Sequence, residues 1–150
     1  MDRLIAFDPG AHTAAWATFD GGLLMRCGIE QEPLGRALGQ RFASIAARVV
    51  IELPQVYQQR AWRGDPNDLI AVAVTVGRIM QTFEGTAGET SVVLPHTWKG
   101  NVPKAIMGER ILGRLDHEER SVLERLKLPA TIKHNVIDAI GLGLWALARK

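Results

Sequence analysis

The chain has 150 residues, of which 47% are hydrophobic and 23% charged, and its formal net charge is +2. These values are typical of an ordinary globular protein, so they exclude a disordered, collagen-like or broadly polycationic chain while leaving room for a local basic surface. The sequence has one cysteine, Cys27, which excludes an intramolecular disulfide framework and a cysteine-based zinc site and favours a reducing, cytoplasmic compartment. No uninterrupted apolar stretch approaches the roughly 20 residues of a membrane span. We therefore expect a single domain over 1–150.

The first half of the chain is patterned mainly as β-structure. Short apolar runs predict four strands, over 3–8, 13–19, 23–29 and 48–53. Asp20-Gly21-Gly22 joins the second and third of these strands and is a strong hairpin-turn signal. Apolar residues at helical spacing predict a helix over 34–47. The stretch 54–64 is typical of a loop and is rich in aromatic and basic residues.

The second half is patterned mainly as helix. Asp65 as N-cap and Pro66 at the first helical position predict a helix that reaches about Phe83. A fifth strand is expected over 90–94, followed by helices over 103–115, 117–126 and 133–149. The element order predicts a mixed α/β fold with a five-stranded sheet, in which an antiparallel hairpin comes first and strands then alternate with helices.

Several side chains and surfaces are expected to have simple structural roles. Strand and apolar-helix settings indicate that Trp16 and Trp145 are core residues, and the charged run 116–127 is typical of a solvated helix face. The helix over 66–83 has a small and β-branched face that we expect to be exposed and available for a dimer contact, formed by Ala71, Val74, Thr75 and Arg78.

Three carboxylates lie in or against apolar runs. Asp8 ends the first predicted strand, Glu52 ends the fourth, and Asp138 lies inside the apolar last helix. Burying an uncompensated carboxylate costs several kcal/mol or forces the group to protonate, so such groups indicate a compensating cation, normally a metal ion. An acid at a strand end can also be a turn former or a cap, but the apolar runs around Glu52 and Asp138 offer no capping role. If the first and fourth strands are parallel neighbours, Asp8 and Glu52 emerge from the same sheet edge.

Asp138 has two polar neighbours on the same helix face, His134 four residues before it and Asn135 three residues before it. A hard divalent cation such as Mg²⁺ takes oxygen ligands, and a histidine can join them when Mn²⁺ is used. Phosphodiester hydrolysis is the chemistry that most needs such a cluster, with two cations roughly 3.5–4 Å apart.

Three segments together resemble the RuvC family of Holliday-junction resolvases. They are Phe7-Asp8-Pro9-Gly10 at the end of the first strand, Ile51-Glu52 at the end of the fourth, and His134-Asn135-Val136-Ile137-Asp138-Ala139-Ile140-Gly141-Leu142 in the last helix. The similarity covers nearly the whole chain and includes 95–100, which is similar to a segment that carries a functional lysine in that family. The small size of the chain resembles phage-encoded versions, which implies the cytoplasm of a bacterial or phage-infected cell.

The resemblance implies an RNase H-like fold, with the mixed five-stranded sheet flanked by helices, and a homodimer that resolves four-way DNA junctions by paired Mg²⁺-dependent nicks. The resemblance also implies two Mg²⁺ ions per site, which Mn²⁺ can replace. It implies metal ligands at Asp8, Glu52 and Asp138. The family's fourth ligand, an acid or a histidine one turn before the last, falls here on Asn135, with His134 beside it. We favour His134 as ligand or proton acceptor and keep Asn135 as the second choice.

Aromatic and basic residues near the presumed site are candidates for DNA binding. Tyr57 and Trp62 either cover a core edge or stack on bases, and Arg60 and Arg63 beside them suit phosphate contacts. Three further basic residues follow the fifth strand and are expected to bind phosphates, namely Lys99, Lys104 and Arg110.

Two rival functions remain open on the sequence. One is another nuclease of the RNase H-like superfamily, acting on RNA–DNA hybrids or on branched or flap DNA. The other is a non-catalytic junction-binding protein. The cleavage-sequence preference, the dimer geometry, the aromatic residue that stacks at the branch point and the need for a helicase partner are likewise left open.

Overall fold

The computed structural model describes residues 2–32, 34–42, 47–56 and 64–149. Five strands form one sheet, and they are β1 (Arg3–Pro9), β2 (Thr13–Asp20), β3 (Leu23–Gln31), β4 (Arg48–Glu52) and β5 (Glu89–Val93). The helices of the described residues are α1 (Leu34–Phe42), α2 (Pro66–Phe83), α3 (Pro95–Lys99), α4 (Lys104–Gly113), α5 (His117–Glu124) and α6 (Ala130–Ala146). None of these helices is long and apolar enough to cross a membrane.

The sheet is mixed, as the element order predicts. Its strand order is β3-β2-β1-β4-β5, with β2 antiparallel to both β1 and β3, and β4 parallel to both β1 and β5. Gly21 and Gly22 form the hairpin turn with φ of 58° and 84°. Two successive positive φ values match a type I′ turn, which suits the twist of the flanking strands and favours glycine. The expected hairpin is therefore confirmed.

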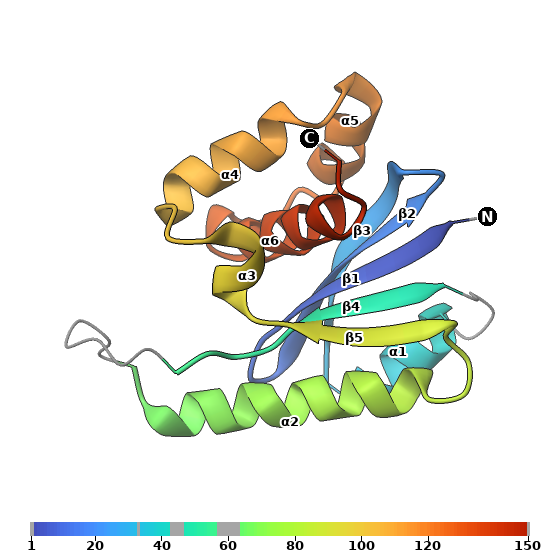
Figure 1. Cartoon of the computed structure of the whole chain (residues 1–150), viewed down its shortest axis with the longest axis vertical. Helices are drawn as coiled ribbons and strands as arrows, with labels where there is room; N and C mark the ends of the chain where they lie inside the picture. Colours follow the sequence, from blue (N-terminus) through green and yellow to red (C-terminus); the bar gives the residue numbers. More distant parts are fainter. Residues whose placement is uncertain (1, 33, 43–46, 57–63, 150) are drawn as a thin grey trace.

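Helices cover both faces of the sheet, with α1 and α2 on one face and α3, α4, α5 and α6 on the other (Figure 1). The alternation of side chains along β1 divides its apolar residues between the two layers. Leu4 and Ala6 pack in the core under α6, whereas Ile5 and Phe7 pack in the core under α1 and α2. The central strand is thus buried on both faces, which explains its continuous apolar run.

Glycines let α6 lie very close to its neighbours. A Cβ atom on Gly143 would lie 2.1 Å from Cε2 of Phe19, and one on Gly141 would lie 2.4 Å from Cδ1 of Ile111 and 2.8 Å from Cζ3 of Trp98. Neither position can take a larger residue unless the neighbouring side chains move. The two glycines therefore set how deeply the helix that carries Asp138 is seated on the sheet.

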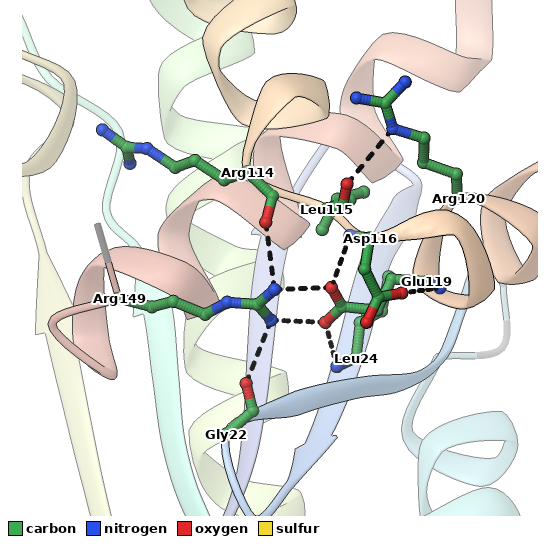
Figure 2. A network of polar contacts seen from close by, with 8 residues as sticks. All are labelled: Gly22, Leu24, Arg114, Leu115, Asp116, Glu119, Arg120 and Arg149. Atoms are coloured by element: carbon green, nitrogen blue, oxygen red, sulfur yellow. Dashed lines mark hydrogen bonds and ion pairs between the residues drawn. The ribbon is translucent and has the colours of Figure 1, made fainter.

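A buried ion pair fixes α5 to the hairpin, which corrects the expectation that the run 116–127 is simply a solvated face. Glu119 is only 2% exposed, and one of its carboxylate oxygens accepts a 2.6 Å hydrogen bond from Arg149. Its oxygens also accept hydrogen bonds from the backbone N–H groups of Leu24, at 2.8 Å, and Asp116, at 3.0 Å (Figure 2). Burial alone would raise the pKa of Glu119, but these hydrogen bonds lower it to about 2.

Other differences from the sequence prediction are local. Trp16 is buried as expected, but Trp145, near the end of α6, is 39% exposed, so its assignment to the core is wrong. Thr75 is buried and donates a hydrogen bond to the carbonyl oxygen of Ala71, so it does not belong to the exposed face of α2. The sequence pattern does not predict the short helix α3, which follows the fifth strand directly.

Candidate active site

Strand pairing brings Asp8 and Glu52 to the same edge of the sheet. Phe7 and Ile51 are register partners in the parallel pair β1–β4, and the two acids directly follow them. The expectation that these strands are parallel neighbours is therefore confirmed. Asp138 joins from α6, which packs across β1 and β2 on one face of the sheet (Figure 1).

The short helix α3 places two donors against these carboxylates. The indole Nε1 of Trp98 donates a 2.6 Å hydrogen bond to Oε2 of Glu52. Nζ of Lys99 lies 3.3 Å from the same oxygen and 3.9 Å from Oδ2 of Asp138. Lys99 thus links the acid at the end of β4 to the acid on α6.

The acids at this point are buried near one another, and burial and like charge both oppose their ionisation. Burial, together with the charges of Glu52 and Asp138, raises the pKa of Asp8 well above its usual range, and Lys99 and Lys104 offset only part of this effect. Burial also raises the pKa of Glu52, against the opposing effects of Lys99 and Trp98. Burial alone would lower the pKa of Lys99, but the three acids raise it. The site therefore has a deficit of positive charge that an added cation would relieve.

The donor set matches a hard divalent cation. Three carboxylates offer the oxygen ligands that Mg²⁺ and Mn²⁺ prefer. Within the described residues, however, no group of three or more His, Cys, Asp or Glu side chains is arranged so that it could hold an ion as it stands. The Lys99 ammonium, which contacts two of the carboxylates, supplies the positive charge instead. The ligand types fit a metal, and binding one requires the side chains around Lys99 to rearrange.

The two candidates for a fourth ligand are both half-buried on α6. His134 and Asp138 line a groove of about 700 Å³ between α4 and α6, and Lys104 lies in the same groove. Asn135 is not among the residues that line this groove. His134 thus shares a groove with one member of the acid cluster, which distinguishes it from Asn135.

The expected DNA-binding residues divide into two groups. Lys99 lies in the acid cluster, Lys104 is exposed at the start of α4, and Arg110 is exposed further along that helix. The others lie outside the described residues, and they are Tyr57, Arg60, Trp62 and Arg63.

Trp98 is the site residue that sequence reasoning missed. A tryptophan next to Lys99 and just beyond a strand end is the signal in the sequence that points to it. Its contact with Glu52 joins residues 46 positions apart, so no local pattern reveals it.

Comparison with known proteins finds similarity in structure. No protein-family model matches the chain, and no curated protein matches it in sequence. T. thermophilus RuvC, solved in complex with a Holliday junction substrate, superposes with a TM-score of 0.60 at 13% identity, over 97% of this chain and 92% of that one. The fowlpox virus Holliday junction resolvase gives a TM-score of 0.59 at 15% identity, over 97% of both chains.

A third similar structure comes from a eukaryotic organelle. The yeast mitochondrial Holliday junction resolvase superposes with a TM-score of 0.54 at 12% identity, over 97% of this chain and 81% of that one. These three resolvases thus share the overall fold of this chain. The chain has the RNase H-like α/β fold of the RuvC-type Holliday junction resolvases.

Proposed function

We propose that the protein is a structure-selective DNA endonuclease that resolves four-way junctions by paired, metal-dependent nicks. The observation that carries this proposal is the meeting of Asp8, Glu52 and Asp138, from β1, β4 and α6, in a chain with the resolvase fold. The pKa of Asp8, raised by burial and by the two other acids, supports a need for added cations at this point. We further propose that residues 1–150 act as one domain, in the cytoplasm.

In this proposal the three acids hold Mg²⁺, with Mn²⁺ as a substitute and two ions per site. Bound ions would activate the attacking water and stabilise the leaving oxygen. His134 accepts a proton or serves as the fourth ligand, and Asn135 is the alternative for the ligand role. The groove of about 700 Å³ that His134 shares with Asp138 favours His134 over Asn135.

The DNA backbone is held by basic residues on the same side of the sheet as the acids. Lys99, Lys104 and Arg110 follow β5 in sequence and belong to α3 and α4, which lie beside α6 (Figure 1). Cationic side chains at such positions bind phosphates and make the affinity depend on salt. Tyr57 and Trp62 are proposed to stack on bases near the branch point, with Arg60 and Arg63 on phosphates.

Resolution needs two nicks, and each chain offers one acid cluster, so we propose a homodimer. The exposed side of α2 supports this, because Ile70 is 62% exposed, Val74 51% and Met80 42%. A stripe of large apolar side chains on one helix is a common feature of subunit contacts. Arg78, exposed on the same helix, forms an ion pair with Glu32 and would border the contact.

The test is cleavage of a synthetic four-way junction with Mg²⁺, compared with a linear duplex and an RNA–DNA hybrid of matched sequence. The proposal expects paired symmetric nicks in the junction and little cutting of the other substrates. Preference for the hybrid would assign the protein to another RNase H-like activity. Junction binding without cleavage, in either Mg²⁺ or Mn²⁺, would make it a binding protein.

A further inference from the structure

The two oxygens of the Glu52 carboxylate have different surroundings. Oε2 accepts the 2.6 Å hydrogen bond from Nε1 of Trp98 and lies 3.3 Å from Nζ of Lys99. Among the described residues, none donates a hydrogen bond to Oε1. Within the part of the chain that the structure describes, Oε2 is therefore held by two donors, while Oε1 has no donor and is open to a metal ion.

Trp98 is itself firmly held. Its side chain is 9% exposed and belongs to the core cluster under α6, where the absence of a side chain on Gly141 leaves room for the indole ring. Pro95, which is buried, begins the α3 helix, and the backbone N–H of Gly100 closes it on the carbonyl oxygen of His96 at 3.0 Å. A side chain packed in this way loses little freedom when it donates its hydrogen bond, so its N–H direction is largely set by the fold.

The two donors to Oε2 differ in chemistry. The Lys99 ammonium is on a flexible stem, 24% exposed, and is shared between Glu52 and Asp138, so it can move to another anion such as a DNA phosphate. The indole N–H of Trp98 is a donor only, carries no charge and does not titrate. Trp98 can thus go on holding Oε2 after Lys99 has moved.

We propose that Trp98 is a positioning residue of the metal centre, whose indole N–H holds Oε2 of Glu52 and so presents Oε1 to the divalent ion. This inference rests on the proposed function, in which Glu52 is a metal ligand. Groups that orient metal ligands through a hydrogen bond commonly change metal affinity by roughly 10–100-fold when they are removed. The contribution of Trp98 is the fixed orientation of one carboxylate, in addition to its packing in the core.

The test is Mg²⁺ binding to the full chain without DNA, measured by isothermal titration calorimetry. Trp98→Phe keeps an aromatic ring and removes the N–H donor, and we expect it to weaken Mg²⁺ binding by about 10-fold or more. Trp145→Phe is the matched control, since Trp145 is an exposed tryptophan near the end of α6, and it should bind Mg²⁺ as the unaltered chain does. Thermal unfolding in EDTA checks that each variant folds.

A second variant separates the hydrogen bond from the packing. Benzothienylalanine at position 98 keeps the bicyclic shape of tryptophan and replaces its N–H by sulfur. Weakened Mg²⁺ binding with an unchanged melting temperature in EDTA supports the proposal, whereas Mg²⁺ binding equal to that of the unaltered chain overturns it. If Asp8→Asn abolishes Mg²⁺ binding while this variant does not alter it, only the inference about Trp98 fails. If the unaltered chain shows no Mg²⁺ binding that depends on Asp8 and Glu52, the proposed function fails as well.

Discussion

Asp8 and Glu52 occupy equivalent positions on adjacent parallel strands, each one residue beyond the register pair Phe7 and Ile51. Because β1 and β4 are parallel, both strands end at the same side of the sheet, and the two carboxylates face a common space. The negative charges of Glu52 and Asp138 oppose the ionisation of Asp8 and raise its pKa. The same arrangement that suits cation binding therefore destabilises the fold when no cation is present.

Asp8→Asn should stabilise the protein in the absence of metal. Because the pKa of Asp8 is raised in the folded state, its ionisation opposes folding, and stability falls as the pH rises from the unfolded value, about 3.9, through the folded one. Asp8→Asn removes this fall, so its melting temperature in EDTA at pH 7 should be higher, by roughly 2–4 °C for each kcal/mol relieved.

Asp65→Asn is the control for Asp8→Asn, since Asp65 is an exposed N-cap and asparagine caps equally well. Thermal unfolding from pH 4 to pH 8 measures both variants. Added Mg²⁺ should raise the melting temperature of the unaltered chain and leave that of Asp8→Asn nearly unchanged. A lower melting temperature for Asp8→Asn in EDTA would mean that Asp8 is not under electrostatic strain.

Glu119 should make the fold sensitive to acid. Its pKa is lowered to about 2 in the folded state, so the stability it contributes is present above the unfolded value of about 4.3 and is lost as the pH falls from there towards 2. Glu119→Gln breaks a buried pair with Arg149 and should lower the free energy of unfolding at pH 7 by about 3 kcal/mol. Urea unfolding measures this loss. Glu118→Gln, at an exposed neighbouring position, should have almost no effect.

Gly143→Ala should destabilise the protein because the added Cβ would lie 2.1 Å from the ring of Phe19. Overpacking of this kind typically costs about 1–3 kcal/mol. Gly113→Ala on α4 is the control, since a Cβ there meets nothing within 4 Å, and alanine should be neutral or stabilising. Relative to the unaltered chain, the denaturant midpoint should fall for Gly143→Ala and should stay the same or rise for Gly113→Ala. Equal midpoints would show that α6 can move away from the sheet at little cost.

Lys104→Ala should weaken junction binding and reduce its dependence on salt. Each phosphate contact that is lost lowers the slope of log affinity against log salt by about 1. Arg36→Ala on α1, an exposed residue across the sheet from α4, should leave the slope unchanged (Figure 1). Fluorescence anisotropy with a labelled junction, in Ca²⁺ or EDTA to prevent cutting, gives both slopes. A slope for Lys104→Ala equal to that of the unaltered chain would remove Lys104 from the DNA interface.

Features encoded locally were predictable from the sequence. Asp20-Gly21-Gly22 marked the hairpin, and Asp65-Pro66 marked the start of α2, where the Asp65 side chain accepts a hydrogen bond from Asn67 N–H at 2.9 Å. The convergence of Asp8 and Glu52 follows from their places at the ends of two strands that are parallel neighbours. These signals lie within a few residues of the feature they specify.

Features that depend on distant partners were not predictable. Helix α3 has five residues, too few for a helical period to be recognised, and its role depends on Glu52, 46 residues before Trp98. Glu119 lies in a charged run like any solvated helix, and its burial depends on distant partners, Arg149 30 residues away and the backbone N–H of Leu24 95 residues away. Trp145 is 39% exposed although its neighbour Leu144 is fully buried, and no local apolar pattern in α6 reveals this difference.

The acid cluster can be tested one residue at a time. Asp8→Asn, Glu52→Gln and Asp138→Asn should each reduce junction nicking by roughly a thousandfold, because metal ions stabilise phosphoryl transition states by several kcal/mol. Circular dichroism and thermal unfolding confirm that the variants are folded. Any one variant that nicks at the unaltered rate removes that residue from the site.

The most direct measurement is the rate of nicking of a synthetic four-way junction by the unaltered chain and by Asp8→Asn, each with Mg²⁺ and each with EDTA. We expect paired nicks only for the unaltered chain with Mg²⁺, together with junction binding by both proteins. Nicking by Asp8→Asn at the unaltered rate, or junction binding by the unaltered chain without any cleavage in Mg²⁺ or Mn²⁺, would contradict this expectation.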